Sequence, residues 1–206
     1  HPKFTFIDLF AGIGGIRIPF DEMGYHCVFS SEWDAKACQT YFANFGTVPF
    51  GDITKIPANK IPVHDVLLAG FPCQAFSKAG NRLGFDDPTK GNLFFDICRI
   101  LKYHHPKYVL LENVRNLASH DHGKTWNVIH DKLEELGYNL LPEPVIFSPH
   151  YLGIPQHRER VYIMCIRKDI GKVHPFTFTK EQIIPCTINS ILQDDGEIPN
   201  IKEYRI

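Results

Sequence analysis

The sequence predicts an α/β protein built on a mostly parallel β-sheet with helices on both faces. Short runs rich in β-branched and aromatic residues alternate with amphipathic stretches of helix length, joined by short connections. Such alternation is typical of parallel sheets, whose ligands lie at the carboxyl ends of the strands. After Gly137, two further strand-like runs are separated by a Pro- and Gly-rich loop, which predicts an antiparallel pair at the edge of the sheet.

Each predicted element has its own local signal. The runs expected to form buried strands are residues 4–10, 26–31, 65–70 and 108–112. The helices expected between them are residues 13–23, 35–45, 93–104 and 124–136, the last of which Gly137 ends. The antiparallel pair is expected at residues 138–147 and 161–167, and a short helix at residues 188–193. Repeated prolines weaken the pattern after residue 171.

The composition is that of an ordinary globular domain. Of 206 residues, 44% are hydrophobic and 22% are charged, which excludes disordered, collagen-like and coiled-coil classes. The 22 Lys and Arg nearly balance the 23 Asp and Glu, so nucleic-acid binding would depend on local charges. The longest apolar runs, such as residues 66–71, are too short for a membrane span, and the six cysteines form no CxxC pair. We therefore expect a cytoplasmic protein with reduced thiols and no membrane partner.

A glycine-rich turn follows the first predicted strand. The residues DLFAGIGG, at positions 8–15, lead from that strand into the first helix. Glycines there let the backbone approach a ligand beside the positive N-terminus of the helix. The GxGG spacing differs from the GxGxxG of dinucleotide-binding turns, which argues against a pyrophosphate ligand. A tight connection without a ligand is the alternative interpretation.

Acidic residues follow the second strand and the helix after it. Glu32 ends the second strand, where it could accept both ribose hydroxyls of an adenosine, and Trp33 offers a flat face for the purine. Asp52, in GDI at positions 51–53, could accept a hydrogen bond from an adenine amino group. The structural alternatives are a helix-capping acid with a core tryptophan, and a turn role for Asp52. Together the three segments favour an adenosine-bearing ligand without a pyrophosphate.

The most specific segment is GFPCQAFS at positions 70–77, directly after a buried strand. Cys73 stands at the carboxyl end of that strand, before a loop whose basic residues favour the thiolate, and is therefore a candidate nucleophile. Four other cysteines lie within predicted strands and helices and are expected to act as small hydrophobic residues: Cys27, Cys38, Cys98 and Cys165.

Two further segments place charged side chains at the same edge. Glu112 ends the strand at residues 108–112, and a carboxyl emerging from that apolar run could have a raised pKa and donate a proton. Helix capping is the alternative. Arg158 and Arg160 enter the strand at residues 161–167, and strand alternation would aim both guanidinium groups at one site. A solvated charged strand edge is the alternative there.

Seven motifs in this order resemble those of the cytosine-C5 methyltransferase family, chiefly the bacterial modification DNA methyltransferases. They are DLFAGIGG, SEWD, GDI, GFPCQAFS, GNLFFD, LLENV and QHRER, and they span roughly residues 4–168. The resemblance implies a Rossmann-like, S-adenosylmethionine-dependent methyltransferase fold with double-stranded DNA as partner. It implies methyl transfer to C5 of a flipped cytosine within a restriction-modification system in a bacterial cytoplasm.

The same resemblance assigns roles to single residues. It implies that Cys73 is the nucleophile, that Glu112 binds the N3/N4 edge of the base, and that Arg160, supported by Arg158, contacts its O2. No metal site is expected. The residues expected to contact S-adenosylmethionine are Phe10, Glu32, Trp33, Asp52, Ile53 and Leu93, with Gly12 and Gly14 lining its methionine end.

The family's target-recognition region and its final Gly-Asn element have no counterpart in residues 171–206. We therefore expect residues 1–170 to form the catalytic and cofactor-binding domain, and residues 171–206 to begin the connection to a missing recognition region. The remaining motifs would come from a longer chain or from a second chain of a split methyltransferase.

Four other interpretations have less support. A zinc-dependent cytidine deaminase needs HxE and PCxxC, and no second cysteine follows Cys73 at that spacing. A metal site at His120 and His122 lacks a third nearby ligand in the sequence. The others are a catalytically silent binding subunit and an RNA cytosine-C5 methyltransferase of the same family, which a comparison of transfer RNA with duplex DNA as substrate would distinguish.

Overall fold

The computed structural model of the chain describes residues 4–72, 93–175, 184–185 and 187–192. Contacts between residues divide the chain into two compact units. The first takes in the described residues of His1–Ile146 and Arg160–Phe176, and the second takes in those of Phe147–Glu159 and Thr177–Ile206. The expectation that residues 1–170 form the catalytic domain concerns function and stays a prediction.

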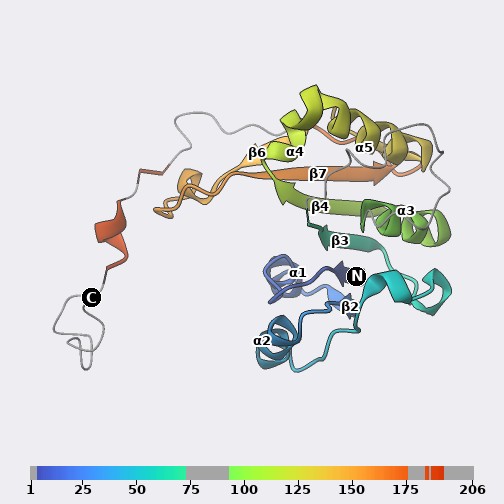
Figure 1. Cartoon of the computed structure of the whole chain (residues 1–206), viewed down its shortest axis with the longest axis horizontal. Coiled ribbons are helices and arrows are strands. Elements are labelled where there is room, and N and C mark those ends of the chain that lie inside the picture. Colours follow the sequence, from blue (N-terminus) through green and yellow to red (C-terminus); the bar gives the residue numbers. More distant parts are fainter. Residues whose placement is uncertain (1–3, 73–92, 176–183, 186, 193–206) are drawn as a thin grey trace. The chain divides into compact units, whose positions relative to one another are not determined.

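A seven-stranded sheet forms the centre of the first unit (Figure 1). Its strands are β1 (Thr5–Leu9), β2 (His26–Ser31), β3 (Val66–Gly70), β4 (Tyr108–Val114), β5 (Tyr138–Leu140), β6 (Val145–Phe147) and β7 (Arg160–Arg167). Their order is β2-β1-β3-β4-β7-β5, and β6 pairs with β7 outside this path. The first four strands are parallel, whereas β7 is antiparallel to β4 and β5. The predicted class and the antiparallel pair at one edge are confirmed.

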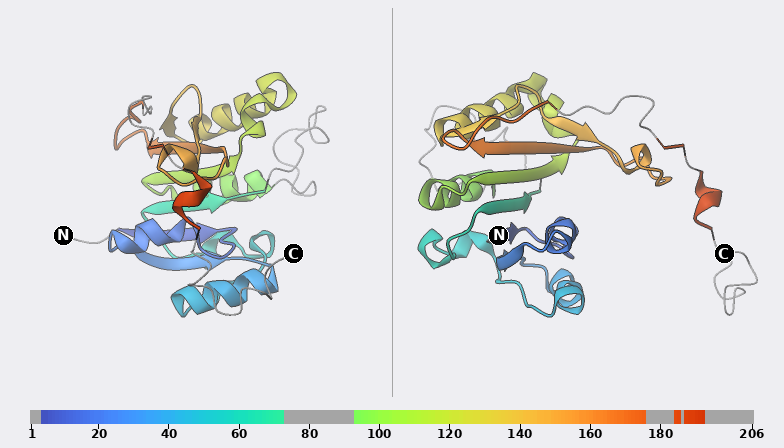
Figure 2. Two further views of the ribbon diagram at one scale, coloured as in Figure 1. Left: turned by 90° about the vertical axis from the view of Figure 1, so that its left-hand side faces the viewer. Right: turned by 180° about the vertical axis from the view of Figure 1, so that it is seen from behind.

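Helices cover the two faces of this sheet unequally. The helices are α1 (Arg17–Glu22), α2 (Ala35–Phe45), α3 (Leu93–His104), α4 (Asn116–Ser119) and α5 (Lys124–Glu135), with 3-10 turns at Ile53–Lys55, Ala58–Lys60, His120–Gly123, Pro149–Tyr151 and Ile188–Ser190. One face holds the larger core cluster, in which strand residues pack against α3 and α5. The other face holds a smaller cluster around Phe6 and Leu68, against which Phe20 of α1 packs. Figure 2 shows α5 near the β7 end of the strand order and α2 near the β2 end.

Burial along the strands follows this arrangement. β1 and β3 are buried almost throughout, as the continuous apolar runs predict. In β4 and β7, by contrast, buried residues such as Leu111 and Ile163 alternate with half-buried ones such as Leu110 and Met164. β1 and β3 are therefore covered on both faces, and β4 and β7 are fully covered on one.

Two predicted elements of the first unit differ most in extent from those observed. α1 begins at Arg17 and not at residue 13, because Gly12 and Gly14 adopt positive φ and keep the preceding residues in turns. The single strand predicted at residues 138–147 is wrong. β5 and β6 are separate strands, because Pro142 and Pro144 lie between them and have no N–H to donate to the ladder.

The other predicted helices agree closely with the structure. α2 and α3 occupy the predicted ranges, and α5 ends one residue early, with Gly137 at φ 91° after its C-cap. The helix predicted at residues 188–193 is limited to the turn Ile188–Ser190. Within the described ranges, no helix combines the length and apolar character that a membrane crossing requires.

Candidate functional site

The parallel strands bring several predicted site residues to one edge of the sheet. Because Leu9 is in register with Ser31 and Gly70 with Glu112, the residues that follow β1, β2 and β3 meet the end of β4 there. A bridge between Ser31 and Phe50 extends this edge, since the Glu32 N–H donates to the Phe50 carbonyl at 2.8 Å. The segment that begins at Gly51 therefore lies beside the end of β2.

The two predicted glycines of the turn after β1, Gly12 and Gly14, have different structural roles. Phe10, Gly12 and Gly14 all have positive φ, at 54°, 55° and 94°. A Cβ on Gly12 would meet nothing within 4 Å, which leaves the backbone there open to a ligand. A Cβ on Gly14 would overlap the ring of Phe45, so Gly14 permits close packing against α2. Gly12 is thus the better candidate for direct contact with a ligand.

Glu32 holds this turn and the start of α2 together. Its carboxylate Oε2 accepts from the Gly12 N–H at 2.8 Å, and Oε1 accepts from the backbone N–H groups of Trp33 and Asp34, also at 2.8 Å. A carboxylate offers about four acceptor positions, so one stays available to a further donor such as a ribose hydroxyl. The acid that caps α2 is Asp34, which accepts from the Ala37 N–H at 2.8 Å.

Solvent exposure differs among three predicted cofactor residues: Trp33, Asp52 and Ile53. Trp33 is 79% exposed, so the alternative of a core tryptophan is wrong. Asp52 caps a 3-10 turn by accepting from the Thr54 N–H and hydroxyl, and these hydrogen bonds hold the pKa of its carboxyl below the usual value. Ile53 is buried in the larger core cluster.

Leu93, the remaining residue predicted to contact the cofactor, is the first residue of α3 and is half-buried. Like the cofactor roles of the other residues, its contact with S-adenosylmethionine stays a prediction.

An ion pair occupies the other half of the edge. The Arg160 Nε lies 3.0 Å from the Glu112 Oε1, and both side chains are about four-fifths buried. Gly70 lies beside this pair: a Cβ there would be in ordinary contact with the Glu112 Oε2 at 3.5 Å and closer, at 3.2 Å, to the Ile16 Cδ1. Antiparallel pairing places Arg160 opposite Val114, two residues beyond Glu112 on the same face. The structure therefore brings together two of the four predicted catalytic residues.

The other two predicted catalytic residues are Cys73 and Arg158. Cys73 lies outside the described residues. Arg158 belongs to the second unit, where its backbone N–H donates to the Ser148 hydroxyl at 3.1 Å. Their predicted roles stay predictions.

Asn113 was not among the predicted site residues, yet it links the two strands at the site. It is buried, and its Nδ2 donates to the Phe71 carbonyl at 2.9 Å while its Oδ1 accepts from the Val114 N–H. Phe71 stands two residues before Cys73, so this hydrogen bond fixes the backbone from which the Cys73 segment departs. The sequence signal was an amide directly after Glu112 at a strand end.

Asp8 is a second group that the sequence analysis missed. It is 1% exposed within β1, and its Oδ2 accepts a long hydrogen bond of 3.5 Å from the Tyr41 hydroxyl. Burial raises the pKa of the Asp8 carboxyl to about 7, although Arg17 and Tyr41 oppose the rise. A lone aspartate inside an apolar strand was the available signal.

The described cysteines fit the expectation of small packing residues. Cys98 and Cys165 are buried in the core, and burial raises the pKa of the Cys98 thiol to about 12 and that of Cys165 further. Cys27 and Cys38 are half-buried, and burial raises the pKa of each thiol as well. These shifts keep the described thiols protonated at neutral pH, which makes them poor nucleophiles.

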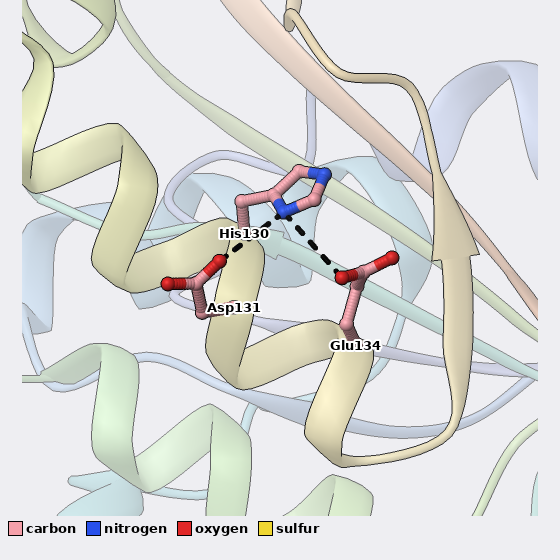
Figure 3. Close-up of side chains that lie close together, drawn as sticks. All are labelled: His130, Asp131 and Glu134. Atoms are coloured by element: carbon pink, nitrogen blue, oxygen red, sulfur yellow. Dashed lines mark ion pairs between the residues drawn. The ribbon is translucent and has the colours of Figure 1, made fainter.

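One group of possible metal ligands lies on α5, away from the carboxyl edge (Figure 3). The His130 Nδ1 lies 3.6 Å from the Asp131 Oδ1 and 3.9 Å from the Glu134 Oε2. Both acids are at least half exposed, and the spacing is that of ordinary ion pairs along a helix. Across the described ranges no comparable three-ligand group includes His120 or His122, and His120 instead bonds the Thr125 hydroxyl.

Solved methyltransferase structures share this fold. A triple mutant of Spodoptera frugiperda DNMT2 superposes with a TM-score of 0.71 at 23% identity, covering 94% of this chain and 60% of that one. S. pombe Dnmt2 gives a TM-score of 0.63 at 22% identity, with 83% and 51% covered. At such identities the likeness establishes the fold class alone.

Sequence comparison identifies the family within that class. The model for C-5 cytosine-specific DNA methylase matches residues 4–206, and the chain belongs to this family. It is 51% identical to Type II methyltransferase M.BsuFI of Bacillus subtilis over 93% of this chain and 46% of that protein. It is 45% identical to M.HhaI of Haemophilus parahaemolyticus over 95% and 59%. The chain thus spans about half the length of these relatives.

Proposed function

We propose that the protein transfers a methyl group from S-adenosylmethionine to C5 of a cytosine in duplex DNA, as part of a restriction-modification system. The observation that carries this proposal is the Glu112–Arg160 pair, which lies beside the strand leading to Cys73. Family membership supports the reaction class, and the names of the relatives support the type II setting. The proposed catalytic and cofactor-binding domain is residues 1–170.

The residues after β1 and β2 fit an adenosine-bearing methyl donor. Glu32 retains an acceptor position for a ribose hydroxyl, Trp33 offers an exposed aromatic face, and the Gly12 backbone is open. Phe10 and Asp52 would add contacts from the neighbouring turns. When bound there, S-adenosylmethionine supplies an electrophilic sulfonium methyl group.

Cytosine C5 is too weak a nucleophile to take a methyl group unaided, and Cys73 addresses this weakness. Its thiolate adds to C6, and the ring becomes an enamine whose C5 carries the electron pair that forms the new bond to the methyl carbon. A base then removes the C5 proton, and the thiolate leaves C6 as the C5–C6 double bond reforms. Cys73 is thereby regenerated, and the product is 5-methylcytosine.

Glu112 and Arg160 would hold the ring during this addition. N3 and O2 are neighbouring positions of the pyrimidine, so two side chains already in contact can span them. Once the base separates the two side chains, Glu112 takes up a proton from solvent and donates it to N3, which makes C6 more electrophilic, while Arg160 stabilises the charge that develops near O2. In the protein without DNA the two charges pair with each other, which limits the cost of keeping them largely buried.

The base must leave the helical stack before these groups can reach it, so we expect a flipped cytosine. The chain spans about half the length of these relatives, so the way in which the whole protein recognises DNA is also part of the proposal. The missing motifs would lie in a longer chain or a second chain. Transfer of the methyl group to RNA is the alternative, and the comparison of duplex DNA with transfer RNA below distinguishes the two.

A methyl-transfer assay tests the proposal. With tritiated S-adenosylmethionine, the full-length protein is expected to label duplex DNA and not transfer RNA, and Cys73→Ala is expected to abolish labelling. Cys27→Ala is the matched control, since Cys27 lies within β2 and has no assigned role in the reaction. Labelling by Cys73→Ala at the parental rate would refute the mechanism, and preferential labelling of transfer RNA would refute the substrate.

A further inference from the structure

The last turn of α2 contacts the glycine-rich turn that is proposed to bind the cofactor, and it restrains the conformation of that turn. The Asn44 Nδ2 donates to the Ile13 carbonyl at 3.0 Å, and the Phe45 ring fills the space beside Gly14. Glu32, just before α2, holds the Gly12 N–H. The conformation of the turn therefore depends on where α2 lies.

Arg17 links α1 to these residues of α2. Its side chain is 11% exposed, and its guanidinium carbon lies 4.2 Å from the centroid of the Phe45 ring, a cation–π distance. Nη1 donates to the Tyr41 hydroxyl at 2.9 Å and to the Thr47 hydroxyl at 3.3 Å, while Nε donates to Asp21 at 2.7 Å. One planar group thus contacts α1, two residues of α2 and the segment after it.

Arg17 also lies directly at the end of the turn. Its backbone N–H donates to the Gly14 carbonyl at 3.1 Å, so the guanidinium and the glycine are joined through a short stretch of chain as well as through Phe45. A lysine would keep the charge, but it could not stack on Phe45 and serve three acceptors at once.

We propose that Arg17 is a positioning residue for the cofactor turn at residues 10–16, acting through Phe45 and Tyr41 without touching the cofactor. This inference rests on the proposed cofactor site. Loss of the guanidinium would let Phe45 move and the turn relax, so that S-adenosylmethionine binding must first restore the turn. The affinity for the cofactor falls, whereas the chemical step at Cys73 and Glu112 is unaffected once the cofactor is bound.

Titration calorimetry with S-adenosylhomocysteine, on the full-length protein, measures this directly. Arg17→Lys is expected to weaken binding about tenfold, equivalent to about 1.4 kcal/mol. In methyl-transfer kinetics its KM for S-adenosylmethionine should rise by a similar factor at unchanged kcat. Arg167→Lys is the matched control, because Arg167 also pairs with an aspartate, at the far end of β7, and should bind as the parent does.

A second variant keeps the test valid if Arg17→Lys does not fold. Phe45→Leu removes the ring that joins Arg17 to Gly14, and the same loss of affinity is expected. Because Arg17 acts in part through Phe45, the loss of affinity in the double variant should be smaller than the sum of the two single losses. Full additivity of the two losses would contradict that route.

Glu32→Ala separates failure of this inference from failure of the proposed function. If Glu32→Ala weakens binding but Arg17→Lys binds within about twofold of the parent, the role of Arg17 is overturned and the cofactor site holds. If neither change affects binding, both proposals fail.

Discussion

The two halves of the carboxyl edge are held in different ways. At the ends of β1 and β2, Glu32 accepts three backbone N–H groups, and the conformation of the turn is fixed by neutral donors and by packing on α2. At the ends of β3 and β4, the charges of Glu112 and Arg160 satisfy each other. If the proposed function holds, the first half already has the conformation that binds the cofactor, whereas the second half must exchange its internal ion pair for contacts with the substrate.

The difference indicates where substitutions should act. A change in the first half alters the conformation of the turn and therefore cofactor affinity. In the proposed reaction, a change in the second half removes a group that contacts the reacting base, and it should therefore alter the rate at saturating cofactor.

The largest effect is expected for Glu112→Gln. An amide cannot protonate N3, so kcat should fall by roughly 10²–10⁴-fold while the affinity for S-adenosylhomocysteine is unchanged. Glu135→Gln, at the exposed end of α5, is the matched control and should leave kcat unchanged. A kcat within a few-fold of the parent would show that Glu112 is not the proton donor.

An intermediate effect is expected at the first half of the edge. Glu32→Ala and Asp52→Ala should each weaken S-adenosylhomocysteine binding by about 1–3 kcal/mol in calorimetry, with little change in kcat. Glu32→Ala should also lower Tm more than Asp52→Ala does, because it removes the acceptor of three backbone N–H groups, one in the turn after β1 and two just before α2. Unchanged affinity in both variants would mean that the adenosine lies elsewhere.

Asp8→Asn is expected to have the smallest effect on catalysis. It should instead change the free energy of unfolding and the way in which that free energy depends on pH. The pKa of Asp8 is about 7 in the folded protein against 3.8 for the free group, so between these values the unfolded chain loses its proton first. Stability should therefore fall as pH rises from 4 to 7, by up to about 1.4 kcal/mol per pH unit. Below this window the group contributes nothing, and above it the penalty is constant.

Urea unfolding between pH 5 and pH 8 measures this dependence. Asp8→Asn should gain stability relative to the parent as pH rises through this window and then level off above pH 7. Asp169→Asn is the control, because Asp169 is exposed and its pKa is lowered by Arg167, so its difference from the parent should be flat. A constant difference for Asp8→Asn would place an ionised carboxylate at that position throughout.

The sequence predicted the fold and the shared edge well, because both follow from local patterns. Apolar runs separated by helix-length stretches require parallel strands, and parallel strands bring Glu32 and Glu112 to the same edge. The distinction between Gly12 and Gly14 could not be predicted, since it depends on where the Phe45 ring lies after α2 packs.

The sequence pattern also could not predict contacts between residues that lie far apart along the chain. Asn113 and Phe71 stand 42 positions apart, and Asp8 and Tyr41 stand 33 apart. Periodicity shows which face a side chain occupies but not which polar group it meets across two strands or between a strand and a helix. Pro142 and Pro144 divide β5 from β6, although the apolar residues on either side of them predict one continuous strand.

The central claim is that Cys73 attacks cytosine C6, and a trapping measurement tests it most directly. Fluorine at C5 cannot leave as a cation, so the elimination step fails and the bond from the Cys73 Sγ to C6 persists. The full-length protein is incubated with S-adenosylmethionine and a pool of duplexes containing 5-fluorodeoxycytidine, then denatured, digested and analysed by mass spectrometry. The account predicts a denaturant-stable adduct on the Cys73 peptide that Cys73→Ala lacks. The absence of an adduct, or an adduct on another cysteine such as Cys38, would contradict it.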